Sequence, residues 1–255
     1  MTNSDNDKDI GRLNAAFSEA LRATTESWAA QFAAINDAVT AQLVSLARIP
    51  VLPPELLETL KGIEETVRRD FEGAARLGQF GWTIPLNATL PECRSLTEAA
   101  TDIASADAAF AKYYEADAGS RVAELWDAVM KVPAVAPSLP LLAESRWVFD
   151  QGRYRVCVLA LLTVLDGVGH RWHEEFFKGS RRKSLFKEKL RAEPGTATHS
   201  IWRSVSSFAE IVFKSQFESS GFNRNWLIHG RGIPDDSPLD CLRVLQAILT
   251  FADLD

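Results

Sequence analysis

The stretch Gly152-Arg-Tyr-Arg-Val-Cys-Val-Leu-Ala-Leu-Leu-Thr-Val-Leu-Asp-Gly167 is the most apolar part of this 255-residue chain. It predicts a buried helix over residues 154–177. The apolar run itself, at residues 156–168, has charged residues at both ends and is shorter than the roughly 18 apolar residues that a membrane-spanning helix needs. We therefore expect a helix inside a protein core and no membrane span.

Helical patterns extend on both sides of this stretch. Apolar residues recur at helical spacing over residues 8–47, which predicts a long amphipathic helix. No segment alternates between apolar and polar residues for long enough to predict a strand, so the expected fold class is all-α. Further helices are expected at 55–77, at 95–116 behind a Ser95-Leu-Thr-Glu98 capping box, at 121–132, at 201–217, and after the Ser237 cap. The last has one apolar face, formed by Leu239, Leu242, Leu245, Ile248 and Leu249.

Three prolines, Pro133, Pro137 and Pro140, predict a stiff connector and the main domain boundary. Residues 1–140 would then form a helical N-terminal domain or extension that contains the long amphipathic helix. Residues 141–255 would form a C-terminal helical domain. We expect the aromatic residues of the segment 80–85 and Tyr113-Tyr114 to pack the first domain against the second.

Charge is distributed unevenly along the chain. The net charge of −6 argues against a protein that coats nucleic acid over its whole surface. Residues 1–140 hold 12 Lys and Arg against 20 Asp and Glu, whereas residues 141–255 hold 16 against 14. The C-terminal half is therefore the basic half, and all four histidines lie in it.

The N-terminus predicts a cytoplasmic protein, and the cysteines predict core residues. Residues 1–9 lack the basic segment and apolar run of a secretion signal. Cys93, Cys157 and Cys241 lie far apart among apolar neighbours and form no CxxC pair, so we expect small core residues rather than disulfides.

The segment Phe222-Asn-Arg-Asn-Trp-Leu-Ile-His-Gly-Arg231 concentrates polar, reactive residues around a short apolar filler. On a helix, Asn225 and His229 are four residues apart and share a face, and the long side chain of Arg224 can reach round to them. The glycines and the proline at 230, 232 and 234 predict that the helix stops directly after the histidine, which leaves the imidazole accessible. We expect the intervening residues 226–228 to form the apolar side that docks the segment.

Arginine beside histidine suits phosphoryl chemistry. A guanidinium offers a planar fork to phosphate oxygens, and an imidazole titrates near neutral pH. If His229 moves a proton at a ribose 2′-OH or at the leaving 5′-oxygen while Arg224 stabilises charge on the phosphate, RNA cleavage needs no metal and yields a 2′,3′-cyclic phosphate.

This segment resembles the Arg-x4-His motif of the HEPN superfamily, in which Arg, a polar residue and a His form a ribonuclease site. Arg224, Asn225 and His229 match the motif position by position, and Asn223 and Arg231 flank it as supporting residues. The stretch 152–167 is similar to the helix that often precedes the motif, with Asp166 where an acid, commonly Glu, follows the apolar run. The resemblance covers about residues 141–255.

The resemblance implies a HEPN-like helical bundle at the C-terminus and a homodimer whose active site combines both copies. It also implies a toxin or anti-phage abortive-infection effector with RNA as substrate, restrained by an antitoxin or sensor partner. Two other interpretations stay open. The Arg and the His can be structural groups that cap a helix, and the fold can serve as a non-catalytic module for dimerisation or for binding RNA or protein.

The stretch Lys178–Arg191 holds seven cations and one acid. Its residues Arg181, Arg182, Lys183 and Lys187 could follow an RNA backbone, and Phe186 could stack a base; a solvated surface is the alternative. His170 and His173 could share a helical face, but no third ligand stands at metal-ligand spacing. We therefore expect no metal and no cofactor.

Overall fold

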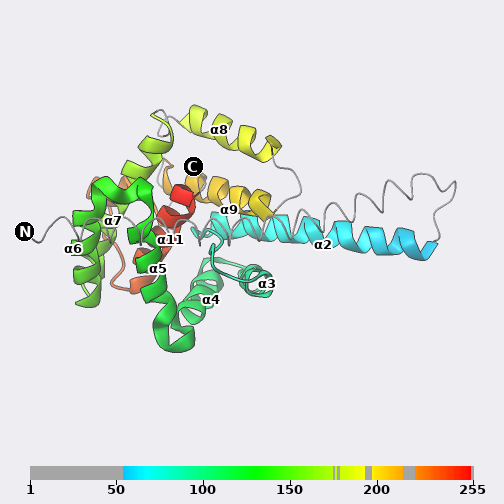
Figure 1. Cartoon of the computed structure of the whole chain (residues 1–255), viewed down its shortest axis with the longest axis horizontal. Helices are drawn as coiled ribbons and strands as arrows, with labels where there is room; N and C mark the ends of the chain where they lie inside the picture. The colour runs from blue at the N-terminus through cyan, green and yellow to red at the C-terminus, as the bar shows by residue number, and fades with distance from the viewer. Residues whose placement is uncertain (1–53, 175, 177–178, 193–196, 215–221, 254–255) are drawn as a thin grey trace, which may run out of the picture. The chain divides into compact units, whose positions relative to one another are not determined.

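A computed structural model of the chain describes residues 54–174, 176, 179–192, 197–214 and 222–253 (Figure 1). Every regular element in these ranges is a helix, which confirms the predicted all-α class. The long helix expected at residues 8–47 lies outside the described residues. The described helices are α2 (Pro54–Gln79), α3 (Leu90–Ala99), α4 (Ile103–Glu115), η1 (Ala116–Gly119), α5 (Ser120–Lys131), η2 (Pro133–Ser138), α6 (Leu139–Asp150), α7 (Tyr154–Trp172), α8 (Gly179–Ala192), α9 (Ala197–Val212), α10 (Arg224–Ile228) and α11 (Pro238–Asp253).

The chain divides into two compact units, residues 1–69 with 193–199 and residues 70–192 with 200–255. All candidate site residues belong to the second unit. Across the described ranges, no helix combines the length and the apolar character that crossing a membrane requires.

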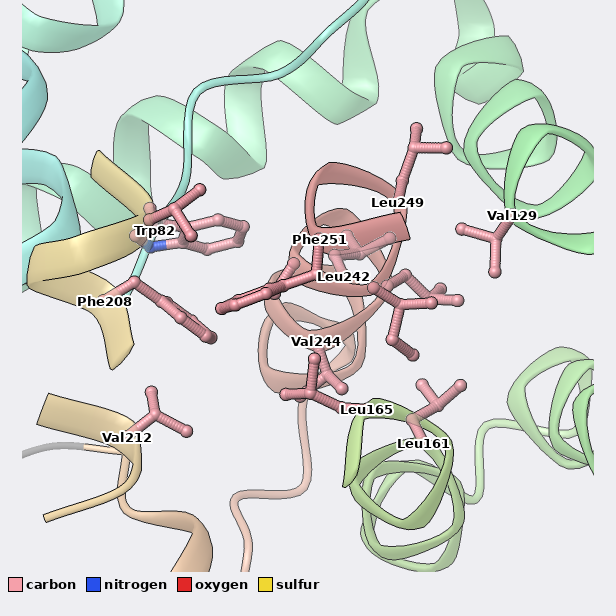
Figure 2. Close-up of a cluster of buried hydrophobic side chains, with 14 of the residues drawn as sticks. Trp82, Val129, Leu161, Leu165, Phe208, Val212, Leu242, Val244, Leu249 and Phe251 are labelled. Carbon is pink, nitrogen blue, oxygen red and sulfur yellow. The ribbon is translucent and has the colours of Figure 1, made fainter. Parts of the chain in front are cut away.

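Helix α11 forms the centre of the second unit. Its residues 240–252 are all buried, although the sequence predicts only one apolar face. The reason is that α11 packs along α7 and also contacts α4, α5 and η2. Figure 2 shows Leu242 and Phe251 of α11 among side chains from α5, α7 and α9. A helix covered on several sides buries its polar positions as well.

Two buried polar side chains of α11, Gln246 and Thr250, form hydrogen bonds with the segment that follows α2 and with α4. Gln246 donates from Nε2 to the carbonyl oxygen of Thr83 and accepts from the hydroxyl of Tyr114. Thr250 Oγ1 lies 3.1 Å from Thr83 Oγ1 and donates to the Gln246 carbonyl at 2.7 Å. Next to them, Trp82 stacks on Phe110 with ring centroids 4.1 Å apart. These contacts fix the segment 80–85 and α4 against the last helix.

The proline-rich stretch lies within this same unit. Residues 133–138 form the 3-10 helix η2, and Pro140 occupies the first turn of α6, where a missing N–H costs no hydrogen bond. Val135 is fully buried, and η2 contacts α7. Residues on both sides of position 140 therefore contribute to one compact unit.

The capping box expected at Ser95 is wrong. Helix α3 begins at Leu90, where the Glu92 carboxylate accepts a 2.7 Å hydrogen bond from the Thr89 N–H. A second cap follows at Asp102, which accepts from the Ser105 N–H at 2.7 Å and starts α4. Thr89 and Ser95 both precede a Glu by three residues, so the box pattern alone did not separate them. Pro91, which suits a first helical turn, favours the earlier start.

Among the residues that the structure describes, seven rings from four helices and their connections form an aromatic cluster, with neighbouring centroids 5.3 to 6.4 Å apart. The cluster holds α8 and α9 against α7 and α11. Its members are Trp172, Phe176, Phe186, Trp202, Phe208, Phe213 and Phe251.

Gly78 permits the close approach of α2 and α9. A β-carbon at this position would lie 2.2 Å from the carbonyl oxygen of Ser204 and 2.8 Å from the backbone nitrogen of Phe208. No side chain fits there without displacing backbone. The end of α2 therefore rests directly on the main chain of α9.

Candidate functional site

The polar segment singled out in the sequence forms the short helix α10, with a defined start and end. Asn223 is the N-cap, and its side-chain oxygen accepts from the Trp226 N–H at 3.2 Å. At the other end Gly230 has a φ of 65°. Its N–H donates to the Leu227 carbonyl at 3.2 Å, and the Arg231 N–H donates to the Trp226 carbonyl at 2.9 Å. This pair of bonds is the Schellman arrangement, and it confirms the predicted stop after the histidine.

Arg224 is held by an acid from a distant part of the chain. Its Nε donates to Asp166 Oδ1 at 2.9 Å, and its Nη2 pairs with Oδ2 of the same carboxylate. Both side chains are about four-fifths buried, with 19% and 21% of their surfaces exposed. Burial raises the pKa of Asp166, and the hydrogen bonds from Arg224 oppose that rise. A two-pronged pairing of this kind fixes the plane of the guanidinium.

Asn225 continues the chain of hydrogen bonds. Its Oδ1 accepts from Arg224 Nη1 at 2.7 Å, and its Nδ2 donates to the Lys214 carbonyl at 3.0 Å. The same carbonyl accepts from Asn223 Nδ2 at 3.2 Å. Asp166, Arg224 and Asn225 therefore form one connected network that links α7, α10 and the end of α9. We call these three residues the Asp–Arg–Asn network.

His229 lies at the C-cap of α10, one turn after Asn225. Its backbone N–H donates to the Asn225 carbonyl at 3.3 Å. The side chain is exposed, and its imidazole makes no hydrogen bond to any residue that the structure describes. The histidine is therefore available to a ligand, while its position along the helix is fixed by the cap.

The supporting residues differ in their placement. Asn223 joins the start of α10 to the end of α9 through its two side-chain hydrogen bonds. The side chain of Arg231 is exposed beyond the helix end. Neither Lys214 nor Phe213 was expected from the sequence as part of the site, because they act through backbone carbonyls, which carry no side-chain signature.

The basic stretch is the helix α8, and its four expected RNA-binding residues separate into two groups. Lys183 and Lys187 are exposed, and Arg181 is partly exposed and lies 3.7 Å from Glu188. Arg182 has a different environment. It is only 5% exposed, donates to the Phe176 carbonyl at 3.4 Å, and places its guanidinium 5.4 Å from the ring centroid of Phe213.

Arg182 therefore does not face solvent together with its neighbours, which corrects its expected role on an RNA surface. Burial lowers the pKa of this guanidinium. Phe186 is likewise unsuited to stacking a base, since it is 2% exposed inside the aromatic cluster. Arg182 and Phe186 are buried for the same physical reason, since one face of α8 packs against the aromatic cluster. The local charge pattern of the sequence cannot predict that packing.

Through Arg182 and Phe213, however, α8 is brought close to the motif. Phe213 contacts Arg182 on one side, and its carbonyl lies 3.4 Å from Asn225 Nδ2 on the other. Helix α8 therefore packs beside the end of α9, and α10 contacts the same end of α9. The exposed face of α8 carries Lys183 and Lys187.

Trp226 and Leu227, expected to be on the docking side of the segment, line a pocket of about 620 Å³. Ile228 is more exposed, at 36%.

The chain was compared with protein-family models, with curated proteins and with solved structures. None of the three comparisons finds a match.

Proposed function

We propose that this chain is a metal-independent endoribonuclease of the HEPN type, with Arg224, Asn225 and His229 as its site. The observation that carries the proposal is the pairing of a buried, oriented arginine with an exposed histidine at the end of the same short helix. These are the two groups that cleavage by an internal 2′-hydroxyl requires: one to stabilise charge on the phosphate and one to move a proton.

In the proposed reaction, the ribose 2′-oxygen attacks the adjacent phosphorus and the bond to the 5′-oxygen breaks. His229 either accepts the proton of the 2′-hydroxyl or donates a proton to the departing 5′-oxygen, and solvent water supplies or takes up the other proton. Arg224, held by Asp166, stabilises the charge that builds on the phosphate oxygens. The products are a 2′,3′-cyclic phosphate and a free 5′-hydroxyl, and no metal takes part.

The exposed side chains of α8, Lys183 and Lys187, supply the proposed path for the RNA backbone, together with Arg181 at its edge. Their contribution would be electrostatic and independent of base sequence, since lysine contacts phosphate as a point charge. We further propose that the protein acts in the cytoplasm as a toxin or abortive-infection effector, and that an antitoxin or sensor partner restrains it.

We propose that the active form is a homodimer with a composite site. Val156 and Leu159 on α7 are 59% and 37% exposed. Together with exposed Thr163 they follow helical spacing along α7 towards Asp166. An apolar strip that ends at the Asp–Arg–Asn network offers a second copy a surface beside the site.

The double variant Val156→Glu/Leu159→Glu is expected to weaken dimerisation by more than about tenfold, because burying two carboxylates in an apolar interface removes roughly 2 kcal/mol or more of binding free energy. Sedimentation velocity measures the dissociation constant, and RNA cleavage should fall in parallel. Val67→Glu, which alters an exposed valine on α2, is the matched control. A wild-type protein that is monomeric and active would contradict the composite site.

The test of the activity is incubation of purified protein with total RNA in the presence of EDTA. Cleavage that survives the chelator, with 2′,3′-cyclic phosphate ends on the products, is the expected result. Cleavage that EDTA abolishes would overturn the metal-independent mechanism.

A second function is favoured by one specific observation. Both Nε and Nη2 of Arg224 are engaged by Asp166, so the arginine also fits a structural role that ties α10 to α7. The chain would then be a non-catalytic helical module that binds RNA or protein. Intact RNA after incubation with well-folded dimeric protein would select this alternative.

A further inference from the structure

The pocket beside α10 has the size of a small-molecule site. Its volume is about 620 Å³, within the range of about 300 to 1,000 Å³ that ligand pockets occupy. It is lined by the face of α10 that carries Trp226 and Leu227, by the segment after α10, and by the start of α11. All of its lining residues belong to the second compact unit.

Aromatic and aliphatic side chains make up much of the wall. Phe80, Phe222 and Trp226 contribute rings, and Leu227 and Ile233 contribute aliphatic surface. Ile233 is 81% exposed, which is unusual for an isoleucine and places an apolar group where a ligand would cover it. Such walls suit a ligand with an apolar body.

The charged residues of the wall leave a surplus of negative charge. Among the described residues, three carboxylates line the pocket, those of Asp107, Asp235 and Asp240, against two cations, Lys214 and Arg243, so one negative charge is in excess. Asp107 Oδ1 accepts from Trp82 Nε1 at 2.7 Å and from Arg243 Nη2. No residue in the described part of the chain donates to its second oxygen.

Arg243 is fixed in the wall and is unsuited to receive an anion. Its Nη1 and Nη2 pair with Asp240 and Asp107, and its side chain is only 5% exposed. Its guanidinium also lies over two rings, 4.9 Å from the Trp82 centroid and 5.4 Å from the Phe222 centroid. Because two carboxylates already balance this cation and its Nε is buried, Arg243 offers little accessible positive charge to an anionic ligand.

We infer that this pocket binds a small organic cation: an ammonium group on an apolar, preferably aromatic, body. The ammonium group would lie by the second carboxylate oxygen of Asp107, within the field of Asp235 and Asp240. The body would pack against Phe222 and Trp226, where a cation also gains from the ring faces. This binding site is independent of the proposed ribonuclease activity, although its occupant would contact the same short helix.

Three probes that share one body and differ in charge test the inference directly: 2-phenylethylammonium, 2-phenylethanol and 3-phenylpropionate. Isothermal titration calorimetry on the full chain is expected to give a dissociation constant at least about tenfold lower for the ammonium than for the alcohol, since one ion pair beside aromatic rings supplies that factor. The carboxylate is expected to bind more weakly than the alcohol. Equal binding of all three, or preference for the carboxylate, would overturn the inference.

Two adjacent exposed acids provide a matched pair of variants. Asp235 lines the pocket and Asp236 does not. Asp235→Asn is expected to weaken binding of the ammonium about threefold, whereas Asp236→Asn should leave it within about twofold, because the charge acts over a short distance. Asp107→Asn should have a larger effect, with circular dichroism to verify its fold. Equal effects of Asp235→Asn and Asp236→Asn would show that the ammonium probe does not bind in this pocket, and would overturn the inference.

Discussion

Replacement of His229 by alanine is expected to reduce RNA cleavage by about 10²- to 10⁴-fold, the contribution typical of a general acid or base. The imidazole is exposed and makes no hydrogen bond to the described residues, so its removal should leave the fold intact. Cleavage is measured as the initial rate on a defined RNA in EDTA, alongside the thermal midpoint. The midpoint should be unchanged within error.

Arg224 needs a different design, because Arg224→Ala would leave Asp166 about four-fifths buried without its partner. Arg224→Lys keeps the charge but loses the planar guanidinium that pairs with both oxygens of a carboxylate. It should lower the cleavage rate while it preserves most of the stability.

A His229→Ala protein that cleaves RNA at the wild-type rate would remove the histidine from the mechanism. Loss of activity together with a lower thermal midpoint in His229→Ala would indicate a structural role for His229.

The variant Phe251→Ala is expected to lower the free energy of unfolding by about 3–5 kcal/mol, the usual cost of truncating a buried phenylalanine. Phe251 is 2% exposed and contacts the rings of Trp172, Phe176, Phe186 and Phe208. Its loss would open a cavity where α8 and α9 meet α7 and α11. Urea unfolding followed by circular dichroism measures the change.

Trp147→Ala is the control for this variant. It also truncates a large aromatic residue, but its side chain is 63% exposed, so the free energy of unfolding should change by no more than about 0.5 kcal/mol. Phe251→Leu should lie between the two, since leucine fills part of the space. A Phe251→Ala protein as stable as the wild type would show that the aromatic cluster does not hold these helices together.

Local signals in the sequence predicted where α10 stops, whereas the N-cap role of Asn223 was not predicted. Asn223 is an amide just before a helix, and Gly230 is the residue type that adopts a left-handed conformation without strain, so each acts through its own backbone neighbourhood. The all-α class could also be predicted from local signals, because helical periodicity depends on residues that are three and four positions apart. Where two local signals competed, as at Thr89 and Ser95, pattern alone chose the wrong one.

Tertiary packing decided most of what surrounds the motif. Nothing in the spacing of Asp166 and Arg224, 58 residues apart, required the pairing of their side chains. The burial of Arg182 depends on Phe176 and Phe213, which come from two other parts of the chain. The pocket beside α10 draws its carboxylates from α4, from the segment after α10 and from α11.

The sequence by itself determined the helical class, the stop of α10 after the histidine and the polar residues that the motif presents. The tertiary structure alone decided that Asp166 reaches Arg224, which cations of α8 remain exposed and that residues 240–252 of α11 are all buried. The physical reason is the range of the interactions. Capping and helical periodicity act within one or two turns, whereas burial and ion pairing depend on groups that only folding brings together.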